Sequence, residues 1–351
     1  MQTRVIQLDR ERPDSSAIVE AADVLRRGGL VAFATETVYG LGAIATEPRA
    51  VRRIFEAKGR PSFNPLIVHV DGMDRARECS LGWDELASEL ATRFWPGPLS
   101  LILPRSRRIP DEVTAGRPTV AVRMPATPVA LALIGQLGAP LAAPSANRSN
   151  RISPTRAEHV LADLDHRVDL ILDTGPTSLG LESTVLDLTT VPPRILRPGP
   201  LMAPEIEAAI RGLRLAEGPS RQGHEGTFPD ATAPAASPGM LPVHYAPTTP
   251  AYRIGPGDDP HGIVWPDRSA LLIVGELAGV RWPREVPRIV LAEPTVAARE
   301  LYATLHDLDA RGLQAIFVAM PPLGLEWAAI RDRLHRATRP LVEQLPLDVE
   351  E

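Results

Sequence analysis

The sequence lacks the features that define several common protein classes. It has a single cysteine, Cys79, in 351 residues, so a disulfide framework within the chain is impossible and a cysteine-built metal site is not expected. No apolar run approaches the roughly 20 residues that cross a bilayer, and residues 1–4 contain no apolar signal core. We therefore expect a cytoplasmic protein that makes no membrane contact.

Positive charge is not in excess. The chain has 38 Lys and Arg residues against 43 Asp and Glu residues, a formal net charge of -5 and a sequence pI of about 6.0. The net charge therefore gives no indication of a nucleic-acid partner, although a local basic patch that contacts nucleic acid is compatible with it.

Motifs of covalent and metal-dependent catalysis are also missing. The sequence has no H-E-x-x-H, Walker A or G-x-S-x-G pattern, and no cysteine–histidine pair of the nucleophilic type. We infer that the chemistry rests on positioning of reactants and neutralisation of charge, as phosphoryl and nucleotidyl transfer commonly do.

What is present is an ordinary globular composition, 44% hydrophobic and 23% charged. The length favours two domains, since single cores stop growing near about 250–300 residues. Residues 1–211 alternate between helical and strand patterns and form the first predicted domain. The pattern predicts helices over 15–27 and 127–137, the latter with Thr127 as N-cap, a helix that begins at Pro48, and another that follows an N-cap at Ser153. It predicts strands over 30–33, 66–68, 99–103, 120–122, 141–143 and 170–172.

The remainder divides into a linker and a second domain. Residues 212–250 are rich in Gly, Pro, Ala and Ser, which is typical of a linker. Residues 251–345 follow a strand and helix alternation that predicts a smaller, parallel, Rossmann-like sheet. Its expected strands are 271–274, 289–291 and 315–318, and its expected helices 294–311 and 325–336. No G-x-G-x-x-G turn is present, so no nucleotide site is assigned there.

Polar side chains follow the predicted strands of the first domain. The stretch 35–42 places two hydroxyls, a carboxylate and two glycines directly after a buried strand, where ligands of α/β folds often bind. A capped turn explains the same residues. Further clusters of this kind occupy 144–149, 180–185 and 194–197. If these clusters converge, they form one polar, cationic cleft.

Two cations bracket a flexible glycine at the end of a predicted helix. Lys58 and Arg60 flank Gly59, and Asn64 follows. A guanidinium fork and an ammonium point charge suit a polyphosphate, but both side chains could instead satisfy the last carbonyls of the helix. His69 lies in the next strand, and a lone histidine in a strand is usually structural.

In this order, the motifs 35–42, 58–64, Ser145-Ala146-Asn147, 182–185 and Arg197-Pro198-Gly199 resemble those of the YrdC-like family of threonylcarbamoyl-adenylate synthases. The segment 237–247, with His244 and Tyr245, is similar to the linker of the longer two-domain members. The resemblance covers nearly the whole chain.

The resemblance implies a fold and a reaction. The first domain should be α/β, with a twisted mixed sheet around a concave cationic cavity, and the second domain Rossmann-like. The family condenses L-threonine, bicarbonate and ATP to threonylcarbamoyl-AMP and pyrophosphate. Downstream tRNA threonylcarbamoyl transferase proteins then use the product to form threonylcarbamoyladenosine in tRNA.

Site residues are carried over from the same resemblance. Lys58 and Arg60 should be catalytic, through charge near the phosphates. L-Threonine should contact Thr37, His69, Arg123, Ala143 and Ser183. ATP should contact Arg60, Asn64, Thr119, Ser145, Ser153, Arg197 and Tyr245. No residue is assigned to a metal; Mg²⁺ should arrive with ATP and take few protein ligands.

The linker and two departures complete the expectations. Prolines around Tyr245 restrict its directions, which favours a lid over the nucleotide rather than a simple tether; a Tyr245 that only anchors the linker is the alternative. Ala34 stands where relatives often have proline, and Asn150 where glycine is common.

Two other functions compete with this interpretation. A non-catalytic RNA-binding module is disfavoured by the retained polar clusters and the acidic net charge. A carbamoyl-transfer maturation factor would bring cysteine-rich zinc modules, whereas this chain has only Cys79.

Overall fold

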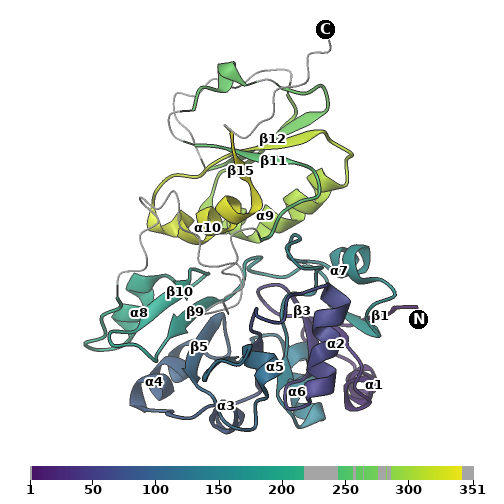
Figure 1. Cartoon of the computed structure of the whole chain (residues 1–351), viewed down its shortest axis with the longest axis vertical. Helices are drawn as coiled ribbons and strands as arrows, with labels where there is room; N and C mark the ends of the chain where they lie inside the picture. The colour runs from purple at the N-terminus through teal and green to yellow at the C-terminus, as the bar shows by residue number, and fades with distance from the viewer. Residues whose placement is uncertain are drawn as a thin grey trace. The chain divides into compact units, whose positions relative to one another are not determined.

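The computed structural model describes residues 2–216, 244–255, 258–263, 265–275, 282 and 286–341. The chain divides into two compact units (Figure 1). The first unit comprises 1–149 and 153–242, and the second comprises 150–152 and 243–351. Residues 217–243 of the expected linker lie outside the described residues.

The first unit contains a ten-stranded sheet. Its strands are β1 (Arg4–Gln7), β2 (Val31–Ala34), β3 (Tyr39–Ile44), β4 (Ile67–His69), β5 (Leu99–Pro104), β6 (Thr119–Arg123), β7 (Leu141–Ala142), β8 (Leu170–Asp173), β9 (Thr184–Asp187) and β10 (Arg194–Arg197). The strand order is β1-β8-β2-β3-β7-β4-β6-β5-β9-β10. The sheet contains both parallel pairs, such as β4 with β6, and antiparallel pairs, such as β5 with β6, so the predicted mixed sheet is confirmed.

Helices of the first unit cover the sheet unevenly. They are α1 (Ser15–Arg26), α2 (Pro48–Lys58), α3 (Met73–Cys79), α4 (Glu85–Phe94), α5 (Asp111–Thr114), α6 (Pro128–Leu137), α7 (Ala157–Leu164) and α8 (Ala203–Ala209). The apolar faces of α1 and α6 pack together against β2, β7 and β8, and Figure 1 shows this pair at one end of the unit. The larger core lies on the opposite side and includes residues of α2, α3, α4 and α7.

On the part of the sheet formed by β4, β5, β6 and β9, the face that α1 and α6 cover elsewhere holds only a small apolar cluster, and its buried members all come from these strands. It includes Ile67 of β4 and Ala121 of β6, which are register partners. Because side chains alternate along a strand, His69 and Arg123, two residues further on, lie on the same face. They are again register partners. The polar pair therefore lies on the same face as α1 and α6, since His69 is in register with Leu141 of their core, but beside a cluster to which no described helix contributes.

The structure corrects two local predictions. Residues 39–42 are not loop but the first part of β3, which pairs antiparallel with β2. Glycine suits this strand because a Cβ at Gly42 would lie 2.8 Å from the ring of Phe33. Ser153 does not cap the following helix: α7 begins at Ala157 after Arg156, and the Ser153 hydroxyl contacts Glu182 instead.

The second unit is a five-stranded parallel sheet. Its strands are β11 (Ala251–Ile254), β12 (Ser269–Val274), β13 (Arg288–Leu291), β14 (Ala315–Ala319) and β15 (Arg339–Pro340), in the order β13-β12-β14-β11-β15. Helices α9 (Pro294–Asp309) and α10 (Ala328–Ala337) lie on the same side of it in Figure 1. Two short 3₁₀ helices, η1 (Pro260–Gly262) and η2 (Leu325–Trp327), complete it. The predicted parallel sheet is confirmed.

Two non-glycine residues among those described in the second unit adopt a left-handed backbone. Asn150 has a φ of 65° and its carbonyl accepts a hydrogen bond from Ala246 N at 2.9 Å. This conformation suits glycine and is tolerated by asparagine, which accounts for the departure noted at this position. Tyr245 has a φ of 64°, which is strained for an aromatic residue.

Candidate active site

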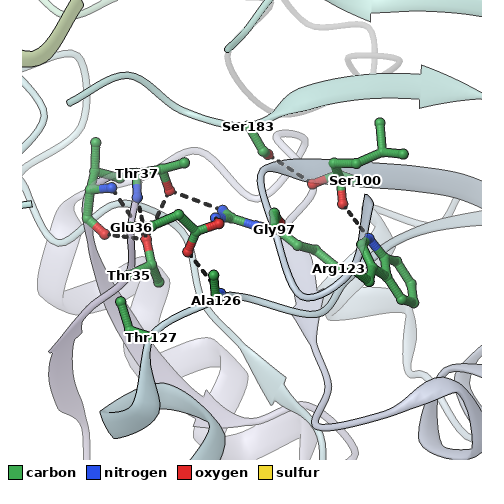
Figure 2. A network of polar contacts seen from close by, with 12 residues as sticks. Thr35, Glu36, Thr37, Gly97, Ser100, Arg123, Ala126, Thr127 and Ser183 are labelled. Atoms are coloured by element: carbon green, nitrogen blue, oxygen red, sulfur yellow. Dashed lines mark hydrogen bonds and ion pairs between the residues drawn. The ribbon is translucent and has the colours of Figure 1, made fainter. Parts of the chain in front are cut away.

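A buried ion pair lies at the centre of the first unit's polar residues (Figure 2). The Arg123 side chain is 4% exposed and forms a salt bridge with Glu36, which is 9% exposed. Arg123 also donates from Nη1 to Thr37 Oγ1 at 3.0 Å and from Nε to Gly97 O at 3.1 Å. The second Glu36 oxygen accepts from Ala126 N at 3.0 Å. The guanidinium plane is thus fixed from three directions.

The hydroxyls before β3 form a tight turn that fixes Thr37. Thr35 Oγ1 donates to Val38 O at 2.7 Å and lies 2.8 Å from Thr37 Oγ1. Thr37 is fully buried, and Figure 2 shows its hydroxyl between Thr35 and Arg123. The sequence left a ligand-binding stretch and a capped turn as alternatives for these residues. In the structure the same hydroxyl groups form both the turn and the polar site.

His69 lies beside this pair, in register with Arg123 across β4 and β6. Its side chain is buried, and burial, together with the neighbouring Arg123 cation, lowers its pKa to about 3. The imidazole is therefore neutral at physiological pH. Its Nδ1 atom is buried without a hydrogen-bond partner among the described residues. Such an orphaned atom is uncommon and costs about 1–3 kcal/mol.

Ser183 directly precedes β9 and contacts residues of both β5 and β10. Its hydroxyl lies 2.8 Å from Ser100 Oγ and 3.1 Å from Arg197 Nη2. Arg197 also donates twice to the Ser183 carbonyl, at 3.1 and 2.9 Å. The glycine after Pro198 allows this approach, since a Cβ at Gly199 would lie 2.4 Å from Thr184 N.

The backbone at Ala143 closes the sheet side of the site. Ala143 N donates to Ile67 O at 3.0 Å, next to β4. Thr37, His69, Arg123 and Ala143 therefore lie on directly bonded or paired segments. The position of Ser183 follows from β9, which pairs with β5, and β5 pairs in turn with the Arg123 strand.

Lys58 lies beneath the loop that carries Ser145. Its ammonium donates to the carbonyl oxygens of Ser145, at 2.6 Å, and Asn147, and its own carbonyl accepts from Ser149 N at 2.8 Å. Burial lowers the pKa of Lys58 well below its usual value, and the Arg60 cation adds to this effect. Lys58 thus satisfies carbonyls of a neighbouring loop, rather than those of its own helix.

Arg60 and Asn64 close a compact turn after α2. Arg60 Nε donates to Asn64 O at 3.2 Å and Nη2 to Pro65 O at 2.9 Å. Asn64 is fully buried, yet neither its amide nitrogen nor its amide oxygen has a partner among the described residues. Next to this turn, a small pocket is lined by Pro65 and Thr119, among others.

The two other residues expected to contact ATP lie in different surroundings. Ser153 is fully buried and donates to Glu182 Oε1 at 2.5 Å. Tyr245 belongs to the second unit, where its ring stacks on Tyr302 at 5.7 Å between centroids and lies 5.2 Å from the Arg333 guanidinium. The first unit alone therefore contains every assigned site residue except Tyr245.

Two site residues received no role from the sequence. Glu36 balances Arg123, and Ser100 contacts Ser183. Glu36 had a detectable signal, because it is an acid between two threonines directly after an apolar strand, where an unpaired carboxylate would be costly. Ser100 had none, since one serine inside an apolar strand has many structural explanations.

The described residues contain neither a candidate metal-ligand cluster nor a membrane-spanning helix. No group of three or more His, Cys, Asp or Glu side chains there is placed to hold a metal ion. Within the same ranges, no helix is long and apolar enough to cross a membrane.

Comparisons with known proteins identify relatives along the whole chain. A Sua5/YciO/YrdC family model, described as telomere recombination, matches residues 23–199, and a model of the threonylcarbamoyl-AMP synthase C-terminal domain matches 202–338. Threonylcarbamoyl-AMP synthase of Pyrococcus abyssi is 41% identical over 337 residues, covering 94% of this chain and 96% of the relative. The Bacillus subtilis protein of that name is 50% identical over 234 residues, 66% and 65% of the two chains.

A solved structure resembles both units. The crystal structure of P. abyssi Sua5 complexed with L-threonine superposes with a TM-score of 0.82 at 39% identity, covering 96% of this chain and 98% of that one. A variant of the same protein, with an adjacent histidine and tyrosine replaced by alanine, superposes with a TM-score of 0.80 at 37% identity over the same shares. With both family models matched in order and a relative aligned over nearly its full length, this chain belongs to the threonylcarbamoyl-AMP synthase family in its two-domain Sua5 form.

Proposed function

We propose that this chain is a nucleotidyltransferase that condenses L-threonine, bicarbonate and ATP into threonylcarbamoyl-AMP and pyrophosphate. The observation that carries the proposal is the buried cluster of Arg123, Thr37 and His69, which lies beside an apolar cluster made only of strand residues. The match to a family of this activity, including a relative crystallised with L-threonine, supports the same conclusion.

Arg123 is suited to bind the threonine carboxylate. A guanidinium has five N–H groups, and three of them serve Glu36, Thr37 and Gly97. One N–H on each terminal nitrogen is left, which is the fork that a carboxylate accepts. Glu36 keeps the site neutral before threonine binds, so the arginine carries no uncompensated charge in the empty site.

His69 and Thr37 are placed to recognise the rest of the amino acid. A neutral imidazole with one buried unpaired nitrogen can bond the threonine hydroxyl or amine. Burial of the site also favours an uncharged substrate amine, because desolvation lowers the pKa of an ammonium group. A neutral amine is the form that can attack carbon dioxide or bicarbonate.

ATP would bind toward the end of the sheet that carries Asn64 and Thr119. The two unpaired amide atoms of Asn64 are a donor and an acceptor, which match the edge of a base or a ribose hydroxyl. Arg60 and Arg197 would neutralise phosphate charge, and Ser145 would donate a hydroxyl hydrogen bond, as Ser153 would on exchanging its bond to Glu182 for one to ATP. Lys58 would act on this site through the Ser145 loop that it holds.

Mg²⁺ would enter with the nucleotide. The described residues include no three-ligand cluster, and this ion commonly keeps several waters and binds mainly through substrate phosphates. When bound, it supplies positive charge to the phosphate oxygens. The protein residues would orient the nucleotide and exclude water.

The reaction then proceeds in two steps. The threonine amine attacks carbon dioxide and loses a proton, or it attacks the carbon of bicarbonate and a carbon–oxygen bond breaks to release water; either route gives a carbamate. A carbamate oxygen attacks the α-phosphorus of ATP, the bond from that phosphorus to the bridging oxygen of the β-phosphate breaks, and pyrophosphate leaves. The side chains contribute mainly by holding the carbamate and the α-phosphate together.

Tyr245 and downstream proteins complete the proposal. A left-handed φ at a buried tyrosine stores strain, and such strain is often found at functional positions. Tyr245 and the linker would therefore act as a lid over the nucleotide. Downstream tRNA threonylcarbamoyl transferase proteins would consume the labile adenylate.

Pyrophosphate release from the purified chain tests the function. Release should require ATP, L-threonine and bicarbonate together, and omission of any one should abolish it. Serine should be used more slowly, since one methyl discriminates by about 1–3 kcal/mol, and valine much more slowly still, because the hydroxyl partner would be left unpaired. Release that is indifferent to threonine would refute the proposal.

A further inference from the structure

The second unit has its own cavity at one edge of its parallel sheet. Strands β11 and β14 are register neighbours that end together at Ile254 and Ala319, and Met320 N continues the ladder to Ile254 O at 3.0 Å. A cavity of about 170 Å³ opens there, beyond the carboxyl ends of both strands, and Gly255 and Met320 are part of its lining.

The chain leaves these two neighbouring strands toward opposite faces of the sheet. After β11, Ile263 and Trp265 pack on the sheet face to which Tyr252 and Phe317 belong. The ring centroids of Trp265 and Phe317 lie 4.4 Å apart. After β14, the chain enters α10, which lies with α9 on the other side in Figure 1. Adjacent strands with diverging connections create the crevice in which open α/β sheets bind ligands.

The charges around the cavity favour an anion. Arg253, Arg331 and His335 contribute to its wall, against a single acid, Asp258. Asp258 is already engaged, since its Oδ2 accepts from Gly255 N at 2.7 Å. Two guanidinium groups therefore line the cavity against one lining carboxylate, while Glu326 acts on Arg331 from outside the lining.

Arg331 is held in place before any ligand binds. Its Nη1 donates to the carbonyl oxygens of Pro322 and Gly324, the latter at 2.9 Å. Partial burial lowers its pKa, and Glu326 opposes this effect. The cation thus loses part of its hydration, and a bound anion would offset that loss. Preorganised guanidinium groups suit phosphate oxygens in particular.

The rest of the cavity is apolar. Met320 and Pro321 line it, and Leu323 at its rim is 72% exposed. Leu325, at the start of η2, is 62% exposed. An apolar surface beside a cationic recess matches a molecule with a phosphate at one end and a flat, weakly polar body at the other.

We propose that this cavity binds a nucleoside monophosphate, with the phosphate between Arg253 and Arg331 and the base over Leu323. This would be a second ligand site, separate from the residues assigned to threonine and ATP. The volume fits the phosphate end, so the base would extend over the open rim.

Residue-resolved chemical modification of the full-length chain tests this site. Phenylglyoxal modifies accessible arginines, and peptide mass spectrometry measures the rate at each one. With millimolar AMP, modification of Arg331 and Arg253 should slow several-fold, and inorganic phosphate should protect less. Arg288, exposed on β13 of the same sheet, is the control and should not change. Equal rates at Arg331 with and without AMP would overturn the proposal, as would protection by phosphate as strong as that by AMP, which would indicate a simple anion site.

A substitution tests the proposed AMP site independently of the catalytic activity. Arg331→Lys keeps the charge but loses the fork, so AMP protection of Arg253 should weaken about tenfold while threonine-dependent pyrophosphate release is unchanged. Undiminished protection of Arg253 in a folded Arg331→Lys chain would show that the fork does not hold the phosphate. Thermal unfolding of the variant confirms folding in either case.

Discussion

Substitution of Arg123 by methionine should affect stability and threonine binding together. The change leaves Glu36 buried, at 9% side-chain exposure, without its cation. Removal of one partner from a buried ion pair costs about 3–5 kcal/mol. For a domain of roughly 150–250 residues, each kcal/mol lowers the melting temperature by about 2–4 °C, so we expect a fall of roughly 6–20 °C.

A second substitution distinguishes the structural from the functional role. In Arg123→Met with Glu36→Gln, no charge is buried and the glutamine can still accept from Ala126 N, so most of the lost stability should return. Threonine binding should not return, because the carboxylate fork is absent. Arg52→Met, which breaks an exposed pair with Glu112, is the matched control and should cost less than about 1 kcal/mol.

The assays are differential scanning calorimetry and isothermal titration with L-threonine. Two results would refute the reasoning. A single variant as stable as the control variant would mean that Glu36 does not depend on Arg123. A double variant that binds threonine as tightly as the unsubstituted chain would remove Arg123 from the threonine site.

Three further substitutions follow from the buried polar groups. Asn64→Leu removes two unpaired amide atoms, so denaturant unfolding should show unchanged or higher stability while the KM for ATP rises; a clearly destabilised variant would mean that the amide is already satisfied. His69→Gln should flatten the pH dependence of stability. The folded-state pKa of about 3 lies below the unfolded value of about 6.5, so stability falls as pH drops through this window. Between pH 7 and 5, the unsubstituted chain should therefore lose about 2 kcal/mol more than the variant, and parallel curves would contradict the neutral histidine. Lys58→Met should lower the free energy of unfolding by about 2–4 kcal/mol, since the carbonyls of Ser145 and Asn147 lose a buried donor; a loss below about 1 kcal/mol would mean that those carbonyls have other partners.

The sequence predicted those parts of the fold whose signals are local. The helix at Ser15–Arg26 and the parallel sheet of the second unit follow from apolar spacing and from glycine and proline positions. The strand Tyr39–Ile44 was missed because its glycines suggest a turn, whereas they are needed for the close approach of Phe33. Ser153 matches the sequence pattern of a helix N-cap, but a buried contact with Glu182 determines its position.

The family resemblance assigned Thr37, His69 and Arg123 to one site, and that assignment stays a prediction; what the sequence did not give is their arrangement, which the sheet register and hydrogen bonds provide. No local pattern could show that Glu36 neutralises Arg123, because the two residues lie 87 positions apart. Likewise, Lys58 has the same sequence signal as a phosphate ligand and as a support for a neighbouring loop.

Mass spectrometry of the product tests the central claim most directly. The chain is incubated with ATP, L-threonine and ¹³C-bicarbonate, and the reaction is analysed at once for adenylates. We expect an adenylate that contains threonine and one labelled carbon, formed together with pyrophosphate and absent without threonine. Pyrophosphate or AMP formed without such an adenylate, or an adenylate that carries no label from bicarbonate, would contradict the account.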